Sequence, residues 1–277
     1  MVTGSRGQLG RALQAACTGR GHSFVGVDLP EVDITDAGAV RRLVVRTAPE
    51  VIVNCAAFTA VDAAEEREAE ALGVNGVAVA ALAEAADRAG ATLVQLSTDY
   101  VFAGDAGRPY REDDPPAPRS AYGRTKLAGE VAAARAGRHL IVRTAWLYGE
   151  GGANFVEAIR VQLARGATTL RVVADQVGNP TYAADVAAAL LDLIMLGAAG
   201  TVHAVNEGRA TWCDFARAIV AGLGMEGDVV PITTTEASRP APRPAFSVLD
   251  TGRLAALLGR RLPDWRDALS RYLAAVR

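Results

Sequence analysis

Cysteine is scarce in this sequence. The 277 residues contain three cysteines, Cys17, Cys55 and Cys213, which are isolated from one another and odd in number. Because no C-x-x-C pair occurs, the sequence indicates neither a zinc site nor a disulfide framework. We therefore expect reduced, buried thiols in a cytoplasmic protein.

A strong charge of one sign and long apolar runs are also lacking. The net charge of −2 at pH 7 gives no reason to expect a nucleic-acid or anionic-membrane partner. No apolar run approaches the roughly 18 residues of a membrane span, and no basic-then-apolar signal peptide opens the chain. Half of the residues are hydrophobic, which is ample for one large domain or two closely joined ones.

A glycine-rich turn is the first feature that points to a ligand. It follows a short predicted strand, residues 1–3, and precedes a predicted helix that runs to Ala16. Between strand and helix, the G-x-x-G-x-x-G spacing lets backbone N–H groups approach a pyrophosphate at the helix N-terminus. The candidate cofactor-binding residues of this turn are Gly4, Ser5, Arg6, Gly7, Gln8 and Leu9.

Two charged residues point to different dinucleotides. Asp28 ends a second predicted strand, residues 23–28, where a carboxylate would bind an adenosine ribose. Arg6 lies in the glycine turn itself, where a cation could hold a ribose 2′-phosphate. Asp28 thus favours NADH and Arg6 favours NADPH, and the sequence leaves both open.

Predicted strands and helices alternate along the first half of the chain. Residues 33–36 are predicted to cap the next helix, and Asp33 and Ile34 are further cofactor candidates. Residues 51–57 are predicted to form a buried parallel strand that ends in small side chains, against which a cofactor could lie. A long helix over residues 65–89 follows. The alternation predicts an α/β fold with a doubly wound, Rossmann-type parallel sheet.

The candidate catalytic residues lie beyond the next predicted strand, residues 92–97. Thr98 follows that strand, at the sheet edge where chemistry collects in such folds, and its hydroxyl can bond a substrate carbonyl. Tyr122 and Lys126 share one helix face, one turn apart. We expect the lysine ammonium to lower the pKa of the phenol from about 10 toward neutrality, which suits a proton donor. The plainer alternatives are a threonine that caps a turn and an ordinary exposed Tyr–Lys pair.

The second half of the chain is predicted to form a smaller C-terminal α/β domain. We place a dinucleotide-binding domain in residues 1–148, rejoined by about 185–206, and a substrate-binding domain in residues 149–277. Within the latter, residues 149–154 form a polar glycine loop that could act as a flap. Residues 238–243, rich in Pro and Arg, would suit a diphosphate because guanidinium groups pair oxyanions bidentately; the alternative is a solvated linker.

Together these motifs resemble the extended short-chain dehydrogenase/reductase superfamily and, more narrowly, the dTDP-4-dehydrorhamnose reductase family. The likeness runs from residue 4 to about residue 250, in consistent order and spacing. Besides the glycine turn, it rests on residues 54–62, 97–102, 122–130, 143–148, 175–181 and 239–244.

The resemblance implies roles for individual residues. Tyr122 would donate a proton, Lys126 would assist it and bind the nicotinamide ribose, and Thr98 would orient the carbonyl. Further cofactor contacts implied by the resemblance are Ala57, Phe58 and Thr59, and the implied substrate contacts are Val61, Thr98, Asp99, Tyr100, Trp146, Arg239 and Arg243.

The chain departs from the family in one respect. Some relatives form a dimer through a metal held by glutamates, one of them on the first helix. The matching residues here, Arg11, Ala12 and Leu13, include no carboxylate. We therefore expect no metal and a monomer or a weak homodimer.

The function implied by the resemblance is reduction of the 4-keto group of a dTDP-6-deoxy-L-sugar by NADPH or NADH. The foremost substrate is dTDP-4-dehydro-L-rhamnose, which would yield dTDP-L-rhamnose. One alternative is a reductase of a related keto-sugar nucleotide in antibiotic biosynthesis, such as a dTDP-dihydrostreptose synthase. Another alternative is a non-catalytic regulatory subunit of the same fold. This alternative is disfavoured because the chain keeps all three candidate catalytic residues, Thr98, Tyr122 and Lys126.

Overall fold

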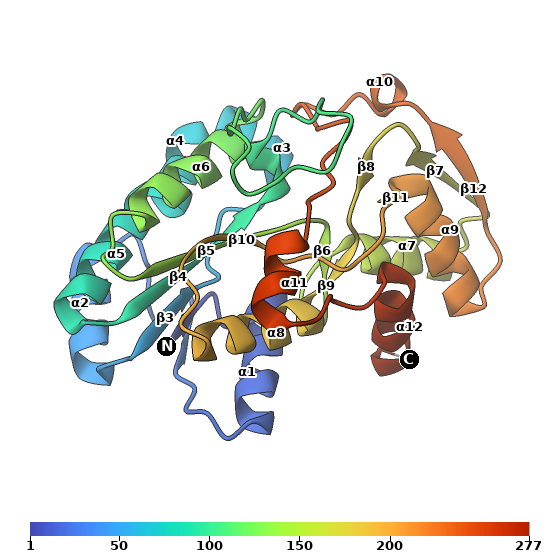
Figure 1. Ribbon diagram of the computed structural model, residues 1–277. Coiled ribbons are helices and arrows are strands. Elements are labelled where there is room, and N and C mark those ends of the chain that lie inside the picture. The colour runs from blue at the N-terminus through green and yellow to red at the C-terminus, as the bar shows by residue number, and fades with distance from the viewer. Residues whose placement is uncertain (277) are drawn as a thin grey trace.

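A six-stranded parallel sheet organises the fold of residues 1–276, which the computed structural model describes (Figure 1). The strands lie in the order β10-β5-β4-β3-β1-β2, and all five neighbouring pairs are parallel. This arrangement confirms the predicted α/β class and doubly wound parallel sheet. The strands are β1 (Val2–Thr3), β2 (Gly26–Val27), β3 (Val51–Asn54), β4 (Thr92–Thr98), β5 (His139–Thr144) and β10 (Gly200–His203).

Helices cover both faces of this sheet because its strands are apolar on both sides. Val53 and Val94 pack with one set of helices, while their neighbours Ile52 and Leu93 pack with the other. The first set is α1 (Gln8–Gly19), α8 (Ala183–Met195) and α11 (Gly252–Leu258). The second set is α2 (Ala37–Thr47), α5 (Ala78–Ala89) and α6 (Ala121–Ala133).

The long helix predicted over residues 65–89 is in fact interrupted. It consists of α3 (Val61–Glu66), α4 (Glu68–Leu72), a π-helical segment (Gly73–Val77) and α5. By length and composition alone, Glu68–Ala89 is apolar enough to cross a membrane, so the expectation that no run approaches that length is wrong. Half of its most apolar window is buried inside the protein, as in a core helix that packs against α2 and α6.

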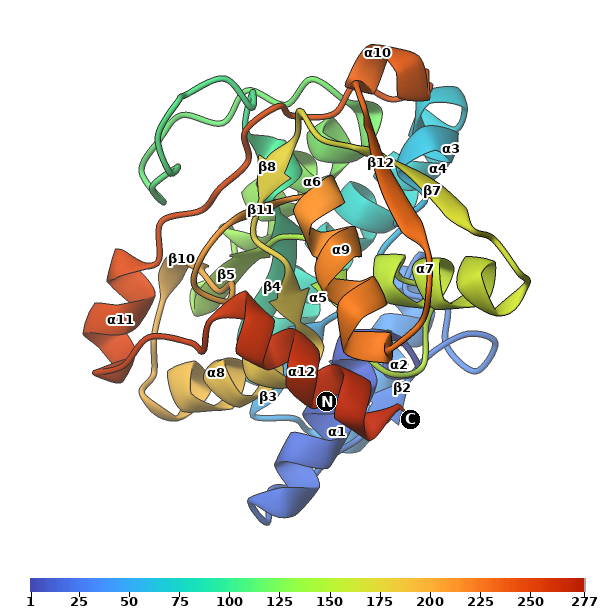
Figure 2. The same ribbon diagram turned by 90° about the vertical axis from the view of Figure 1, so that its right-hand side faces the viewer.

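A second group of elements lies beside the sheet, on the right in Figure 1 and toward the viewer in Figure 2. Its core is rich in aromatic rings, among them Tyr148, Phe215, Trp265 and Tyr272. The helices are α7 (Phe155–Ala164), α9 (Trp212–Leu223), α10 (Thr234–Ala237) and α12 (Trp265–Ala275). Three short strand pairs complete it: β7 (Thr169–Val173) with β12 (Asp228–Ile232), β8 (Val177–Gly178) with β11 (Ala210–Thr211), and β6 (Leu147–Tyr148) with β9 (Thr181–Tyr182).

The chain returns to the large sheet after β9. Helix α8 packs against α1, and β10 pairs with β5. The exact division of the chain into two domains stays a prediction.

One predicted helix cap is confirmed, and one predicted strand is shortened. The Asp36 carboxylate accepts hydrogen bonds from Gly38 and Ala39 at the start of α2. Thr211 forms a capping box with Asp214 at the start of α9. The second strand, predicted over residues 23–28, contains only Gly26–Val27, because β1, its neighbour in the sheet, offers just two residues to pair with.

Candidate active site

A cavity of about 870 Å³ opens at the carboxyl ends of the central strands, where ligands bind in open α/β sheets. Both groups of elements contribute to its walls. Nearly all predicted site residues line it: Gly4, Gly7, Gln8, Leu9, Asp28, Asp33, Ile34, Ala57, Phe58, Thr59, Val61, Thr98, Asp99, Tyr100, Tyr122, Lys126 and Trp146. The structure does not place Ser5, Arg6, Arg239 or Arg243 in the cavity wall.

The glycine turn connects β1 to α1 at one end of the cavity. Gly4 adopts a φ of +64°, and a side chain there would lie 2.6 Å from the backbone nitrogen of Ala56. The N-cap residue of α1 is Gly7, which offers no side-chain cap to the first N–H groups of the helix. These groups are therefore available to an anion, which suits the pyrophosphate of a dinucleotide.

Arg6 and Asp28 are linked to each other in this structure. The Asp28 carboxylate accepts a hydrogen bond of 2.8 Å from the Arg6 backbone nitrogen. The Arg6 guanidinium donates to the Leu29 carbonyl at 2.7 Å and pairs with Glu31. Arg6 thus lies just outside the cavity, beside the residues that would surround an adenosine ribose, and Glu31 is a neighbour that the sequence motifs did not single out.

The predicted catalytic residues converge at the centre of the cavity. Ser120 caps α6 by accepting from the Gly123 nitrogen at 3.1 Å, which places Tyr122 in the first turn. A side chain at Gly123 would come within 2.2 Å of the Tyr100 carbonyl oxygen, so glycine lets this turn approach residues 98–100. The Tyr100 and Tyr122 rings meet edge to face, with centroids 5.6 Å apart. The structure thereby brings Tyr122 against the end of β4.

The Thr98 hydroxyl connects two titratable groups. It donates to the Asp99 carboxylate at 2.9 Å and also lies within hydrogen-bonding reach of the Tyr122 phenol, where it favours the phenolate. A hydroxyl carries one proton, so it donates to one of these two oxygens at a time. The plainer prediction for Thr98 also holds, because its oxygen accepts from the Tyr100 nitrogen at 3.2 Å and caps the short 3₁₀ turn Asp99–Val101.

The expectation that Lys126 lowers the pKa of Tyr122 is wrong for this structure. Burial, together with the nearby Asp99 carboxylate, raises the pKa of Tyr122 to about 12. The Lys126 ammonium instead donates to the Leu96 carbonyl at 2.6 Å, and Leu96 lies two residues before Thr98 on β4. Burial lowers the pKa of Lys126 to about 8. The free protein therefore keeps Tyr122 protonated, which is the state a proton donor needs.

Asp99 is buried beside these groups, with 1% of its surface exposed. Its Oδ2 atom has no hydrogen-bond partner of ordinary geometry among residues 1–276. Burial raises the pKa of this carboxyl to about 6, although the Ser247 and Thr98 hydroxyls oppose the rise. Its charge therefore changes within the range where enzymes work.

Two further hydroxyls in the cavity wall lack partners. The side-chain oxygens of Ser97 and Thr144 are buried without a hydrogen bond to any described residue. Buried polar groups in native proteins are nearly always paired, so these two are suited to a ligand. Together with the glycine turn and a cavity of this size, they fit a bound nicotinamide dinucleotide.

Asn75 holds the loop that begins with Phe58. Its amide accepts from the Phe58 nitrogen at 2.9 Å and donates to the Phe58 carbonyl and the Thr125 hydroxyl, both at 3.1 Å. Asn75 lies in the π-helical segment, a feature often found at functional sites. It fixes Phe58 relative to α6, a role that no sequence motif indicated.

The predicted diphosphate-binding arginines contact Asp62 in this structure. Arg243 pairs bidentately with the Asp62 carboxylate at 2.8 and 3.0 Å, and Arg239 lies 3.8 Å from it. These contacts hold residues 239–243 against the start of α3, beside the cavity residues Val61 and Tyr100. The phosphate role of the two arginines stays a prediction.

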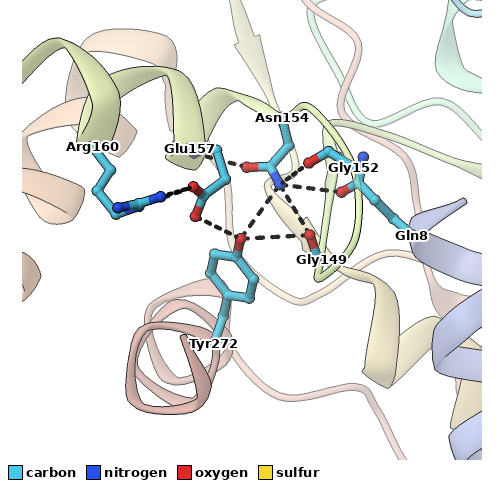
Figure 3. A network of polar contacts seen from close by, with 7 residues as sticks. All are labelled: Gln8, Gly149, Gly152, Asn154, Glu157, Arg160 and Tyr272. Atoms are coloured by element: carbon cyan, nitrogen blue, oxygen red, sulfur yellow. Dashed lines mark hydrogen bonds and ion pairs between the residues drawn. The ribbon is translucent and has the colours of Figure 1, made fainter. Parts of the chain in front are cut away.

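The loop of residues 149–154 contributes Gly152 and Ala153 to the cavity wall. The Asn154 carboxamide caps α7 and donates toward the carbonyls of Gly149 and Gly152 at 3.0 and 3.2 Å (Figure 3). It also approaches Gln8 and Tyr272, both at 3.4 Å, so one amide links the loop to α1 and α12. The predicted flap is therefore held down in this structure, through contacts with a predicted cofactor residue.

The aromatic wall of the cavity contains two tryptophans. Trp146 was predicted as a substrate contact, whereas Trp212, at the start of α9, carried no motif. Their rings stack with centroids 3.5 Å apart. No group of three or more His, Cys, Asp and Glu side chains able to hold a metal occurs among residues 1–276.

Comparisons with known proteins show the family of this chain. The family model described as the RmlD substrate binding domain matches residues 1–277. A dTDP-4-dehydrorhamnose reductase of Streptomyces griseus is 46% identical, over 100% of this chain and 93% of that protein. A dTDP-4-keto-6-deoxy-D-glucose reductase of Streptomyces niveus is 42% identical, over 98% of this chain and 94% of that protein.

A solved structure supplies the cofactor comparison. The dTDP-4-dehydrorhamnose reductase of Bacillus anthracis, in complex with NADP, is 36% identical and superimposes with a TM-score of 0.95, over 99% of this chain and 98% of that one. The chain therefore belongs to the RmlD substrate binding domain family, and it is an NAD(P)H-dependent oxidoreductase of the keto-sugar-nucleotide reductase type.

Proposed function

We propose that this protein reduces the 4-keto group of dTDP-4-dehydro-L-rhamnose to give dTDP-L-rhamnose. The observation that carries the proposal is the meeting of Thr98, Tyr122 and Lys126 in one cavity with the glycine turn. The two relatives named above as reductases of dTDP-linked 4-keto sugars support the substrate class. The cavity is of ordinary size for a small-molecule site, and dinucleotide and sugar ring would share it.

The proposed chemistry uses the residues as follows. When bound, the nicotinamide supplies a hydride to the carbonyl carbon. Tyr122 gives its phenolic proton to the carbonyl oxygen, which becomes the hydroxyl of the product. Thr98 holds that oxygen in reach and then donates to the phenolate that Tyr122 leaves behind. Lys126, fixed on the Leu96 carbonyl, places its positive charge on the cofactor side of the tyrosine.

Remote contacts would position the sugar. We assign Val61, Asp99, Tyr100 and Trp146 to the sugar ring, whose apolar face suits an aromatic surface. For Arg239 and Arg243 to bind the diphosphate, they would have to exchange some of their contacts with Asp62 for contacts with the ligand. The free sugar without its nucleotide should then be a very poor substrate, because binding energy far from the ketone orients it.

The test is reduction of enzymatically generated dTDP-4-dehydro-L-rhamnose, followed by loss of NADPH absorbance and identification of the product by mass and NMR. Product formation by the wild type but not by Tyr122→Phe would support the proposal. Oxidation of NADPH with another 4-keto sugar nucleotide, and none with this one, would assign the protein to antibiotic-sugar biosynthesis instead. The Streptomyces niveus relative is the observation that keeps this second candidate open.

Two less specific assignments belong to the same proposal. We place the protein in the cytoplasm, which fits its three unpaired thiols, two buried and Cys55 half-buried in the cavity wall. We also propose a monomer or weak homodimer, to be measured by analytical ultracentrifugation. A stable dimer at nanomolar concentration would contradict that assignment.

A further inference from the structure

Trp212 is a large residue in the cavity wall that no sequence motif marked. It is the first residue of α9, whose capping box of Thr211 and Asp214 fixes the backbone at this point. Its indole lines the same cavity as Tyr122 and Lys126. Residues 146 and 212 are thus 66 positions apart in sequence and adjacent in space.

The contact between the two indoles is a parallel stack. Their ring centroids are 3.5 Å apart and their planes differ by 5°. Trp146 adopts a φ of +44°, an unusual conformation for a tryptophan, directly before β6. A side chain at Gly178 would lie 2.5 Å from the Trp146 ring, so the strand β8 also presses against it. The stack with Trp212 thus occupies one face of the Trp146 indole, and the contacts with Trp212 and Gly178 together fix its orientation.

Trp212 is itself held in place by other contacts. Its Nε1 donates to the Gln176 carboxamide at 3.1 Å, and that carboxamide donates to the Thr234 hydroxyl at 2.9 Å. Phe155 packs on it with ring centroids 4.7 Å apart. The indole is thus tied to the residue before β8, through it to α10, and directly to α7, none of which belongs to the large sheet.

Both indoles nevertheless remain only half-buried. Trp265, by contrast, is fully buried in the aromatic core. Trp146 and Trp212 both line the cavity that holds the predicted catalytic residues. A ligand in that cavity could therefore reach their exposed surface.

We propose that Trp212 is a positioning residue for the substrate. It fixes the plane of Trp146, so that the indole covers the apolar face of the sugar and presents the 4-keto carbon at Tyr122. The inference rests on the proposed function, since it names a residue that acts through a predicted substrate contact. The residues that hold Trp212 belong to the second group of elements and not to the large sheet. In this proposal, the second group therefore orients the sugar.

The experiment compares Trp212→Ala and Trp212→Phe with the wild type in steady-state kinetics and in circular dichroism. Two stacked indoles produce a paired positive and negative band in the far ultraviolet, which both variants should lose. We expect Trp212→Ala to raise the KM for the keto-sugar nucleotide by roughly tenfold, the effect of one lost aromatic contact and a looser Trp146. Trp212→Phe keeps an aromatic ring and should raise the KM less. Both variants should bind NADPH, in the absence of sugar, within about twofold of the wild type.

Trp265→Phe serves as the matched control. This third tryptophan is fully buried outside the cavity, and its Nε1 has no hydrogen-bond partner in the described chain, so phenylalanine leaves no polar group unpaired. The control should keep both the paired band and the wild-type KM. Thermal unfolding of all three variants would identify any general loss of structure.

The outcomes separate this inference from the proposed function. If the wild type reduces a keto-sugar nucleotide and Trp212→Ala has an unchanged KM, the inference alone is overturned. If NADPH binding weakens as much as sugar binding, Trp212 supports the fold in general and the inference is overturned as well. If the wild type neither reduces nor binds any dTDP-sugar in calorimetry with saturating NADP⁺, the proposed function and the inference fail together.

Discussion

Replacement of Asp99 by asparagine removes one buried charge and changes almost no volume. The carboxyl is 1% exposed, accepts one hydrogen bond from Thr98, and has an Oδ2 atom without a partner of ordinary geometry. Asparagine can keep the hydrogen bond with Thr98 through its own carbonyl oxygen. The substitution therefore isolates the cost of burying the charge.

The size and sign of that cost follow from the pKa. Burial raises the pKa of Asp99 from 3.8 to about 6. The neutral carboxyl contributes its full stability below pH 3.8, and that contribution is lost as the pH rises through about 6, because the unfolded chain ionises first. A difference of about 2.2 pKa units corresponds to about 3 kcal/mol at pH 8, and to about 1 kcal/mol at pH 4.5. Asp99→Asn should therefore be more stable than the wild type by about 1 kcal/mol at pH 4.5 and by about 3 kcal/mol at pH 8. Its advantage in unfolding free energy should thus grow by about 2 kcal/mol from the lower to the higher pH.

Urea unfolding of wild type and Asp99→Asn at pH 4.5 and 8 measures this difference directly. Asp192→Asn is a control of opposite sign, since pairing with Arg20 and Arg260 lowers the pKa of Asp192 and its stabilisation is present only above the unfolded pKa. That variant should lose nearly the same stability at pH 4.5 as at pH 8, because both values lie above the ordinary aspartate pKa and Asp192 is ionised in the folded and the unfolded protein alike. A free-energy difference for Asp99→Asn that does not change with pH would refute the buried-charge argument. We also expect Asp99→Asn to reduce turnover, because it alters the electrostatic environment of Tyr122.

Three further predictions concern the site. Tyr122→Phe should retain the fold and NADPH binding but lose turnover by about 10²–10⁴-fold, the usual contribution of a general acid; near wild-type kinetics would exclude Tyr122 as that acid. Arg6→Ala should weaken NADPH binding by about 1.5–3 kcal/mol and spare NADH, as measured by fluorescence titration; equal losses for both would show that Arg6 does not contact the 2′-phosphate. Asn154→Ala should lower the unfolding free energy by about 1 kcal/mol, because α7 loses its cap. It should also speed NADPH release, measured by stopped flow, because the loop loses its contact with Gln8. An unchanged release rate would mean that residues 149–154 do not retain the cofactor.

The features that could be predicted from sequence are those set by neighbouring residues. The glycine turn, the cap at Asp36 and the Tyr122–Lys126 helix all depend on a few consecutive side chains, and the structure contains each of them. The parallel sheet followed from the alternation of apolar strands and helices. The π-helical segment Gly73–Val77 was not predicted because its cause is tertiary: Asn75 bonds the Phe58 loop and Thr125, and α6 packs closely against it.

Contacts between distant residues could not be predicted from spacing. Arg243 meets Asp62 from 181 residues away, and nothing local to either residue indicates that pairing. The same is true of the Trp146–Trp212 stack. The pKa of Tyr122 was predicted in the wrong direction because helix spacing places Lys126 on the correct face but does not show that the Leu96 carbonyl binds its ammonium.

Three of the buried polar groups that lack a partner in the described chain lie close together, and their position has a physical meaning. Ser97, Asp99 and Thr144 each bury an oxygen without a partner among residues 1–276, and all three belong to the ends of β4 and β5 or follow them directly. Each such atom costs free energy as long as it lacks a partner, whereas β4 and β5 pair with each other from Leu93 to Thr98. A ligand that supplies the missing hydrogen bonds would recover that cost on binding. The instability of this strand edge and the affinity of the site for cofactor and sugar are thus consequences of the same unpaired oxygens.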